Sequence, residues 1–257
     1  MPTPVAMSWS GGKDCALALY RLLQDPDYEV VSLLTTVSDE FGRISHHGVR
    51  IALLEQQAAS IGIPLRKVAL PTTDAGPCTM QQYDEVMAET MTRYRDEGVL
   101  TFAFGDIFLE DIRAYREDRL ARMGMRGIFP LWGLDTTTVF EMFLQLGFKA
   151  RIACVDGGRL EGHFAGRMLD AAFRDDLPEG TDICGERGEY HSFVYAGPLL
   201  QRPLAIETGQ RVEREGRHYI DLLPAESSAT GQEAAMEAFP PVGRVPSSEA
   251  TGPASSA

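Results

Sequence analysis

Residues 10–15 (SGGKDC) combine two glycines with a hydroxyl and an ammonium group, directly after an apolar segment. Glycine lets a backbone approach a ligand closely, and the free N–H groups of a following helical turn favour an anion. Ser10 adds a donor and Lys13 a positive charge, which together suit phosphate. The spacing excludes a Walker loop, which would need glycine at Met7 and a hydroxyl residue at Asp14. The alternative is a plain strand-to-helix turn, but such a turn needs neither side chain.

A second chemical segment is CGERGEYH at residues 184–191. Gly185 and Gly188 interrupt both helix and strand, so Glu186 and Glu189 are expected on a tight loop, with His191 starting an apolar strand. Two carboxylates and an imidazole can bind a metal, hold a cationic substrate or a nascent ammonium, or transfer a proton. A charged hairpin without chemistry is the alternative.

Gly105 and Asp106 follow the apolar run LTFAF. A carboxylate beside a triphosphate site is usually a Mg²⁺ ligand, because it would otherwise repel the nucleotide; a helix N-cap is the alternative. Arg113 and Glu117 are four residues apart and share a helix face, as substrate-binding groups or as a surface ion pair. Their charged neighbours are expected to form a solvated face: Glu110, Asp111, Arg116, Asp118 and Arg119.

Thr35 and Thr36 lie at the end of the second apolar run, EVVSLLTTV, where a ligand of a parallel sheet is expected. Ordinary buried strand residues are the alternative. His47 precedes a predicted helix and could contact the nucleotide or orient a substrate, or could be part of a solvated histidine pair.

Strand-like and helix-like segments alternate before residue 130. The expected strands cover 4–9, 29–37, 64–70 and 100–104, and the expected helices cover 14–24, 49–61, 79–96 and 110–123. This order predicts an α/β fold with a doubly wound parallel sheet, Rossmann-like, whose ligands lie beyond the carboxyl ends of the strands. The glycine-rich run and Asp106 both fall at such ends.

A smaller α/β module is expected over 131–223, covering a nucleotide-binding domain at 1–130. Its elements are helices at 136–146 and 164–175, strands at 149–155 and 191–197, and a hairpin over 211–223 that turns at Glu215 and Gly216. Residues 224–257 are rich in Ala, Ser, Gly, Pro and Glu without periodicity, which predicts a disordered tail.

The chain of 257 residues carries a formal net charge of −13. Four acids and one arginine lie beyond Leu223, so the rest keeps −10. This field argues against nucleic acid as a partner. No apolar run reaches the length of a membrane span, the first residues do not resemble a secretory signal, and four scattered cysteines indicate reduced thiols. A cytoplasmic location without membrane contact is expected.

Several motifs together resemble one known family. SGGKD followed by a small residue is the pyrophosphate loop of the N-type ATP pyrophosphatases, the adenine nucleotide α-hydrolases. Further stretches resemble their diphthine–ammonia ligase branch: SHHGVR at 45–50, GDIFLEDIRAYRE at 105–117, FPLWG at 129–133 and DICGERGEYHSFVYAGP at 182–198. The resemblance runs in order over about residues 5–200. One position departs from it: the loop usually ends in serine, and the weakly donating thiol of Cys15 stands there, so one phosphate contact is expected to be weaker.

The resemblance implies an enzyme that uses ATP and Mg²⁺ to adenylate a carboxylate, releases pyrophosphate and transfers ammonia to the acyl adenylate. ATP would be bound by Ser10, Gly11, Gly12, Lys13, Asp14, Cys15, Thr35, Thr36, His47 and Gly105. The catalytic residues would be Lys13, Asp106, Glu186, Glu189 and His191, with Asp106 also binding Mg²⁺, and the substrate would contact Arg113 and Glu117.

The acceptor in archaea and eukaryotes is diphthine, a modified histidine on translation elongation factor 2. The basic residues are almost all arginine, which is typical of a GC-rich genome and suggests a bacterial source. Bacteria make no diphthamide. A bacterial relative would then amidate something else, for example a corrinoid-related small molecule. A homo-oligomer remains open.

Three rival functions use similar features. A tRNA-thiolating enzyme shares the loop but usually needs a cysteine pair and a basic surface. A synthetase for NAD, GMP or asparagine shares the chemistry but not the motifs after residue 45. A regulatory module that binds ATP without catalysis would not need Glu186, Glu189 and His191, and an assay of AMP formation separates it from an enzyme.

Overall fold

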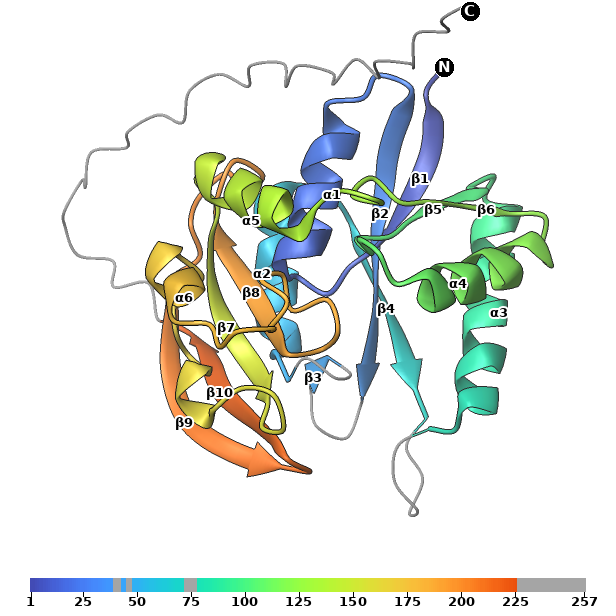
Figure 1. Cartoon of the computed structure of the whole chain (residues 1–257). Helices are drawn as coiled ribbons and strands as arrows, with labels where there is room; N and C mark the ends of the chain where they lie inside the picture. The colour runs from blue at the N-terminus through green and yellow to red at the C-terminus, as the bar shows by residue number, and fades with distance from the viewer. Residues whose placement is uncertain (39–42, 45–47, 72–77, 226–257) are drawn as a thin grey trace, which may run out of the picture. The chain divides into compact units, whose positions relative to one another are not determined.

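The computed structural model describes residues 1–38, 43–44, 48–71 and 78–225. Within these residues, five parallel strands form the first sheet in the order β4–β2–β1–β5–β6 (Figure 1). The strands are β1 (Thr3–Ser8), β2 (Tyr28–Ser38), β4 (Leu65–Leu70), β5 (Thr101–Ala103) and β6 (Arg126–Ile128). The short β3 (Arg43–Ile44) pairs antiparallel with the end of β2. The predicted parallel sheet is confirmed, and β3 and β6 are additions to it.

Helices cover both faces of this sheet: α1 (Lys13–Leu23), α2 (Ile51–Ile61), α3 (Met80–Asp96) and α4 (Glu110–Ala121). Successive side chains of a strand point to opposite faces, so β1 contributes to two cores. Val5 and Met7 belong to a core that includes α1 and α2. Ala6 belongs to a second core with Tyr94 of α3 and Leu120 of α4. The sheet is therefore doubly wound, as predicted.

The second sheet is antiparallel throughout, in the order β8–β7–β10–β9. Its strands are β7 (Lys149–Asp156), β8 (Tyr190–Ala196), β9 (Ile206–Arg214) and β10 (Arg217–Pro224). Two helices belong to the same part of the chain, α5 (Thr136–Gln145) and α6 (Ala171–Asp175). The hairpin turns where predicted, because Glu215 and Gly216 both take positive φ values, 51° and 74°.

The single helix predicted over 164–175 is wrong. The structure has a 3-10 turn, η1 (Gly162–Phe164), then extended chain, and α6 begins only after Asp170, which caps it. Gly166 takes a φ of 86°. The N–H groups of Gly166 and Leu169 donate to the carbonyls of Ile152 and Ala150 at 2.8 and 2.9 Å. Pairing with β7 therefore outweighs the local helical preference of this segment.

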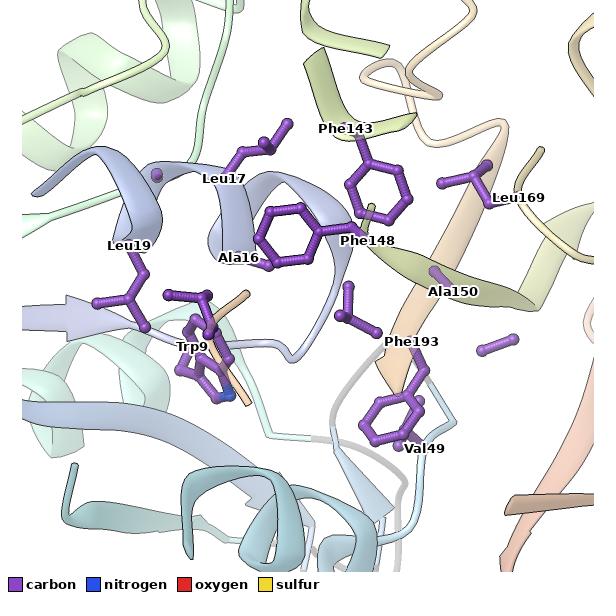
Figure 2. Close-up of a cluster of buried hydrophobic side chains, with 14 of the residues drawn as sticks. Trp9, Ala16, Leu17, Leu19, Val49, Phe143, Phe148, Ala150, Leu169 and Phe193 are labelled. Carbon is purple, nitrogen blue, oxygen red and sulfur yellow. The ribbon is translucent and has the colours of Figure 1, made fainter. Parts of the chain in front are cut away.

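One hydrophobic core connects α1 with the second sheet (Figure 2). Phe148, just before β7, lies edge-on to Tyr20 of α1 at 6.1 Å between ring centroids and is stacked on Phe143 at 5.2 Å. Phe193 of β8 is fully buried in the same core. The division proposed at residue 130 thus separates two sheets that share one core.

Most of the predicted disordered tail, residues 226–257, lies outside the described residues. In the part of the chain that is described, no helix has the length and apolar character needed to span a bilayer.

Candidate active site

The glycine-rich loop connects β1 to α1 at the carboxyl end of β1. Gly11 takes a φ of 76°, and a Cβ there would lie 2.8 Å from Gln57 Oε1. A Cβ on Gly12 would lie 3.0 Å from the Ser192 carbonyl oxygen. Both glycines are therefore needed because other segments of the same chain, around Gln57 and Ser192, approach the loop closely. Gly12 is also the N-cap of α1 and uses no side chain for capping, which keeps this helix end accessible to an anion.

Gln57 and strand β8 hold the loop in place. The Gln57 amide nitrogen donates to the Gly11 carbonyl at 3.1 Å and to the Val194 carbonyl at 2.6 Å. The Val194 N–H donates to the Gly11 carbonyl at 2.9 Å, and the Lys13 N–H donates to Ser192 Oγ at 3.2 Å. A strand some 180 residues away in sequence thus shapes the phosphate-loop candidate.

Lys13 is only 2% exposed. Its ammonium donates to both Asp14 carboxylate oxygens at 2.8 and 2.7 Å and to the carbonyl of Cys184, and it lies 5.4 Å from the Tyr190 ring centroid. Burial lowers the pKa of Lys13, but Asp14 and its other neighbours outweigh that effect, so this pKa lies well above its usual range. The charge faces the segment around Cys184, and its predicted contact with phosphate stays a prediction.

Cys15 lies on the first turn of α1, and Gly105, which follows β5, packs against that turn. Cys15 Sγ is 3.2 Å from Ser10 Oγ. Burial raises the pKa of the Cys15 thiol, so the sulfur remains protonated and a weak donor. A Cβ on Gly105 would lie 2.9 Å from the Asp14 carbonyl carbon and 3.0 Å from the Cys15 nitrogen. Gly105 therefore serves this loop by allowing the chain after β5 to pack against it.

Glu186 is bound to the chain that follows β5. Its Oε1 accepts the Ile107 N–H at 2.8 Å, and its own N–H donates to Asp182 Oδ2 at 2.8 Å. Burial, and next the negative charge of Asp14, raise the pKa of Glu186 from 4.5 to about 7. A carboxyl with this pKa can both give and take a proton near neutral pH.

Glu189 and His191 differ in their surroundings. The Glu189 side chain is 4% exposed, and its Oε1 accepts the Asp182 N–H at 3.4 Å and lies 3.6 Å from Arg159 Nη1. Its Oε2 is buried without a hydrogen-bond partner in the described part of the chain. His191 is partly buried and opposite Cys154 in the β7–β8 register. Glu189 thus fastens the 182–189 loop at its base, and its catalytic role stays a prediction.

Asp106 forms an ion pair with Arg116, at 2.9 Å from Oδ2 to Nε and 3.3 Å from Oδ1 to Nη2. The Arg116 guanidinium lies 4.4 Å from the Phe104 ring centroid. The expectation that Arg116 belongs to a solvated face is therefore wrong. The described residues include no group of three or more His, Cys, Asp or Glu side chains that could hold a metal ion. Asp106 is paired with Arg116, and its role as a Mg²⁺ ligand stays a prediction.

Arg113 and Glu117 form the i,i+4 pair at 2.8 Å from Nε to Oε1. The Arg113 guanidinium also lies 5.0 Å from the Phe129 ring centroid and 4.6 Å from that of Trp132. The motifs 105–117 and 129–133 are thereby in contact, while the substrate role of the pair stays a prediction.

Thr35 and Thr36 lie just beyond the end of β1, because Ser8, the last residue of β1, pairs with Leu34. Thr35 is 3% exposed, and its hydroxyl has no hydrogen-bond partner among the described residues. This hydroxyl is available to a ligand at the carboxyl end of the sheet. His47 lies outside the described residues.

Two family models match consecutive parts of the chain: the diphthamide synthase N-terminal domain over residues 3–127 and the diphthamide synthase C-terminal domain over residues 135–225. The chain belongs to the diphthamide synthase family. This result confirms the resemblance to diphthine–ammonia ligases, and the family is one of ATP-dependent ligases.

Two curated members of the family are diphthine–ammonia ligases. The rat protein is 23% identical over 226 residues, covering 81% of this chain and 84% of its own length. The cattle protein is 24% identical over 228 residues, with the same two coverages. A solved structure described as a predicted subunit of tRNA methyltransferase from Methanocaldococcus jannaschii is 18% identical and covers 86% of this chain and 97% of its own, with a TM-score of 0.35.

Sequence reasoning missed three residues of the candidate site: Gln57, Arg116 and Ser192. Gln57 is fully buried, which is unusual for a long polar side chain. Its position among apolar residues of the helix IALLEQQAASI was the available signal. Arg116 was hidden among charged neighbours, and Ser192 within an apolar strand, so neither had a distinguishing local signal.

Proposed function

We propose that this protein adenylates a carboxylate with ATP, releases pyrophosphate and transfers ammonia to the acyl adenylate, forming an amide. A carboxylate oxygen would attack the α-phosphorus, and the bond between the α- and β-phosphates would break. Ammonia would then attack the acyl carbon, the carbon–oxygen bond to AMP would break, and a nearby base would take the proton lost by nitrogen.

The observation that carries the proposal is the junction of the loop with the 182–192 segment. Lys13 donates through its backbone to Ser192 and through its side chain to the Cys184 carbonyl. Glu186 accepts from Ile107, in the chain that packs on the same loop. A phosphate-binding loop and a titratable carboxyl group in one place support a catalyst over a module that only binds ATP.

The residues suggest separate roles in the two half-reactions. The glycine-rich loop and the start of α1 would hold the phosphates that leave, since helix N-termini stabilise anions. Glu186, with a pKa of about 7, would take a proton from the attacking nitrogen. Mg²⁺ remains a prediction with Asp106 as its expected ligand, and no step is assigned to it.

The acceptor is proposed from the relatives. The rat and cattle proteins are named for diphthine and ammonia, so we propose a diphthine-like carboxylate as the acceptor and free ammonium as the nitrogen source. The same chemistry would serve a small-molecule carboxylate, and the test should therefore include both kinds.

The test is a product assay with the full chain, Mg·ATP and ammonium chloride, together with a diphthine-bearing peptide and a panel of small carboxylates. We expect AMP and pyrophosphate in equal amounts, with one amide formed per AMP, only when both ammonium and an acceptor are present. ADP and orthophosphate as the stoichiometric products would refute the proposal. ATP binding without turnover under every condition would instead favour the regulatory module.

A further inference from the structure

A pocket of about 410 Å³ lies where three segments meet: the chain after β5, the start of α5 and the loop before β8. Phe108 and Leu134 give it apolar walls, and Thr136, Asp182 and Arg187 give it polar ones. Phe108 belongs to the 105–117 motif, and Asp182 and Arg187 belong to the 182–198 motif, but the roles proposed above for these motifs do not use the pocket.

The pocket shares hydrogen bonds with the candidate active site. Asp182 in its wall accepts the Glu186 N–H at 2.8 Å. Phe108 directly follows Ile107, whose N–H donates to Glu186 Oε1 at 2.8 Å. One wall residue therefore holds the Glu186 backbone, and the neighbour of another holds its carboxyl group.

Thr136, also in the lining, is connected to Lys13 through Cys184. The carbonyl of Thr136 accepts the Cys184 thiol at 3.2 Å, and the Cys184 carbonyl accepts from the Lys13 ammonium. The pocket is thus connected to Lys13 through Thr136 and Cys184, and to Glu186 through Asp182.

The charges in the lining differ in how they are used. Asp135 caps α5 by accepting the Thr138 N–H at 2.9 Å, and Asp182 accepts a backbone N–H as described above. Arg187 is exposed, and its guanidinium lies 5.6 Å from the Phe108 ring centroid. In the described part of the chain Arg187 makes no ion pair, so its donors are available for a carboxylate.

We propose that this pocket binds the acyl acceptor and that Arg187 anchors its carboxylate group. The inference rests on the proposed function and adds to it the place and the contact by which the acceptor is recognised. A planar guanidinium is matched to a carboxylate through two parallel hydrogen bonds. Phe108 and Leu134 would contact the apolar part of the acyl group.

Phosphate groups of the nucleotide are the other anions near this site. Asp135 and Asp182 give the lining two negative charges against the one positive charge of Arg187. The net charge of the lining is therefore −1, which disfavours a triphosphate with about four negative charges much more than a carboxylate with one, and Arg187 can pair with that single charge. The pocket is therefore assigned to the acceptor and not to ATP.

Fluorine NMR of the full chain tests the site without knowledge of the true acceptor. The probes are trifluoroacetate, 4-fluorobutyrate and 4-fluorobenzoate, each with its neutral amide. We expect at least one carboxylate to bind more tightly than its amide, and Arg187→Met to weaken that binding by about tenfold or more, as the loss of a charge-assisted pair implies. Arg187→Lys should retain part of the affinity. Arg202→Met removes an exposed arginine after β8, beside the end of α2, and should change nothing.

Equal binding of carboxylates and amides, or equal binding by wild type and Arg187→Met, would overturn the proposal. Displacement of the bound probe by Mg·ATP in a competitive manner would also overturn it, because the pocket would then belong to the nucleotide. Failure of all carboxylates to bind would do the same.

A kinetic arm separates this inference from the proposed function. With any carboxylate that supports AMP formation, Arg187→Met should raise the KM for the carboxylate about tenfold or more and leave the KM for ATP unchanged. If no AMP forms while the NMR result holds, the ligase reaction is refuted and the carboxylate site remains.

Discussion

Replacing Glu186 by glutamine should stabilise the protein, and more so at high pH. Burial raises the pKa of this carboxyl from 4.5 to about 7, with the Asp14 charge as the next cause. The folded state therefore holds the proton more tightly than the unfolded state does. Stability from this group is fully present below about pH 4.5 and is lost as the pH rises to about 7. The complete loss amounts to about 3 kcal/mol.

Glutamine retains the shape of the side chain, and its amide oxygen can still accept the Ile107 N–H that now reaches Oε1. It cannot ionise, so the variant lacks the pH-dependent loss. Between about pH 5 and about pH 8.5, the stability gained by Glu186→Gln should grow by about 2.5 kcal/mol. Amide formation should fall sharply in the same variant, since the proposed base is gone.

Urea unfolding without nucleotide, followed by circular dichroism at the two pH values, measures this difference. Glu179→Gln is the matched control, because Glu179 is an exposed glutamate in the same segment. The stability gained by Glu179→Gln should be near zero at both pH values. Parallel stability curves for wild type and Glu186→Gln would refute the reasoning, and a variant less stable than wild type at the higher pH would show that the carboxylate is favourably paired.

The other predictions concern the phosphate loop and the tail. Lys13→Met should lower the free energy of unfolding in urea by about 3 kcal/mol, because it leaves the Asp14 carboxylate without its buried partner. The double variant Lys13→Met/Asp14→Asn should regain part of the lost stability. Unchanged stability of Lys13→Met would contradict the ion pair. The same Lys13→Met change should weaken ATP binding in calorimetry by about 1.5–3 kcal/mol if the ammonium contacts phosphate. Cys15→Ser should tighten ATP binding by about 1 kcal/mol, since a hydroxyl is the better donor, and weaker binding would show that the thiol is needed. Gly105→Ala should reduce AMP formation at least tenfold, because its Cβ would lie 2.9 Å from the loop backbone; unchanged turnover would mean that the chain can shift there. Removing residues 226–257 should leave the melting temperature and ATP affinity nearly unchanged, and a loss of several degrees would show that the segment docks.

Local patterns in the sequence were sufficient for the nucleotide-binding half of the fold. The apolar runs of residues 29–37 and 64–70 and the amphipathic helices around them predicted a doubly wound parallel sheet, and the glycine pair marked the turn from β1 to α1. These features depend on periodicity and on backbone freedom, which act over a few residues. The ordered motifs also predicted the family correctly.

Contacts between distant segments decided the rest. The segment 165–170 was predicted as part of a helix, yet it lies along β7 because the N–H groups of Gly166 and Leu169 donate to carbonyls of that strand. In the sequence, Arg116 is one of several charged residues of a helix. Only its ion pair with Asp106 in the structure distinguishes it from the others. Side-chain partners some distance apart in sequence leave no periodic signal, so no local pattern contains them.

The site shows the same division. The residue types at 10–15 and 184–191 determined that phosphate binding and proton transfer were available to this chain, because those properties belong to the groups themselves. Only the fold decided that the Lys13 ammonium donates to the Cys184 carbonyl, that Glu186 is partly buried with its pKa raised to about 7 by burial and by the Asp14 charge, and that Arg187 lines a pocket. Burial and the distance to other charges set how an ionisable group behaves, and both are properties of the tertiary structure.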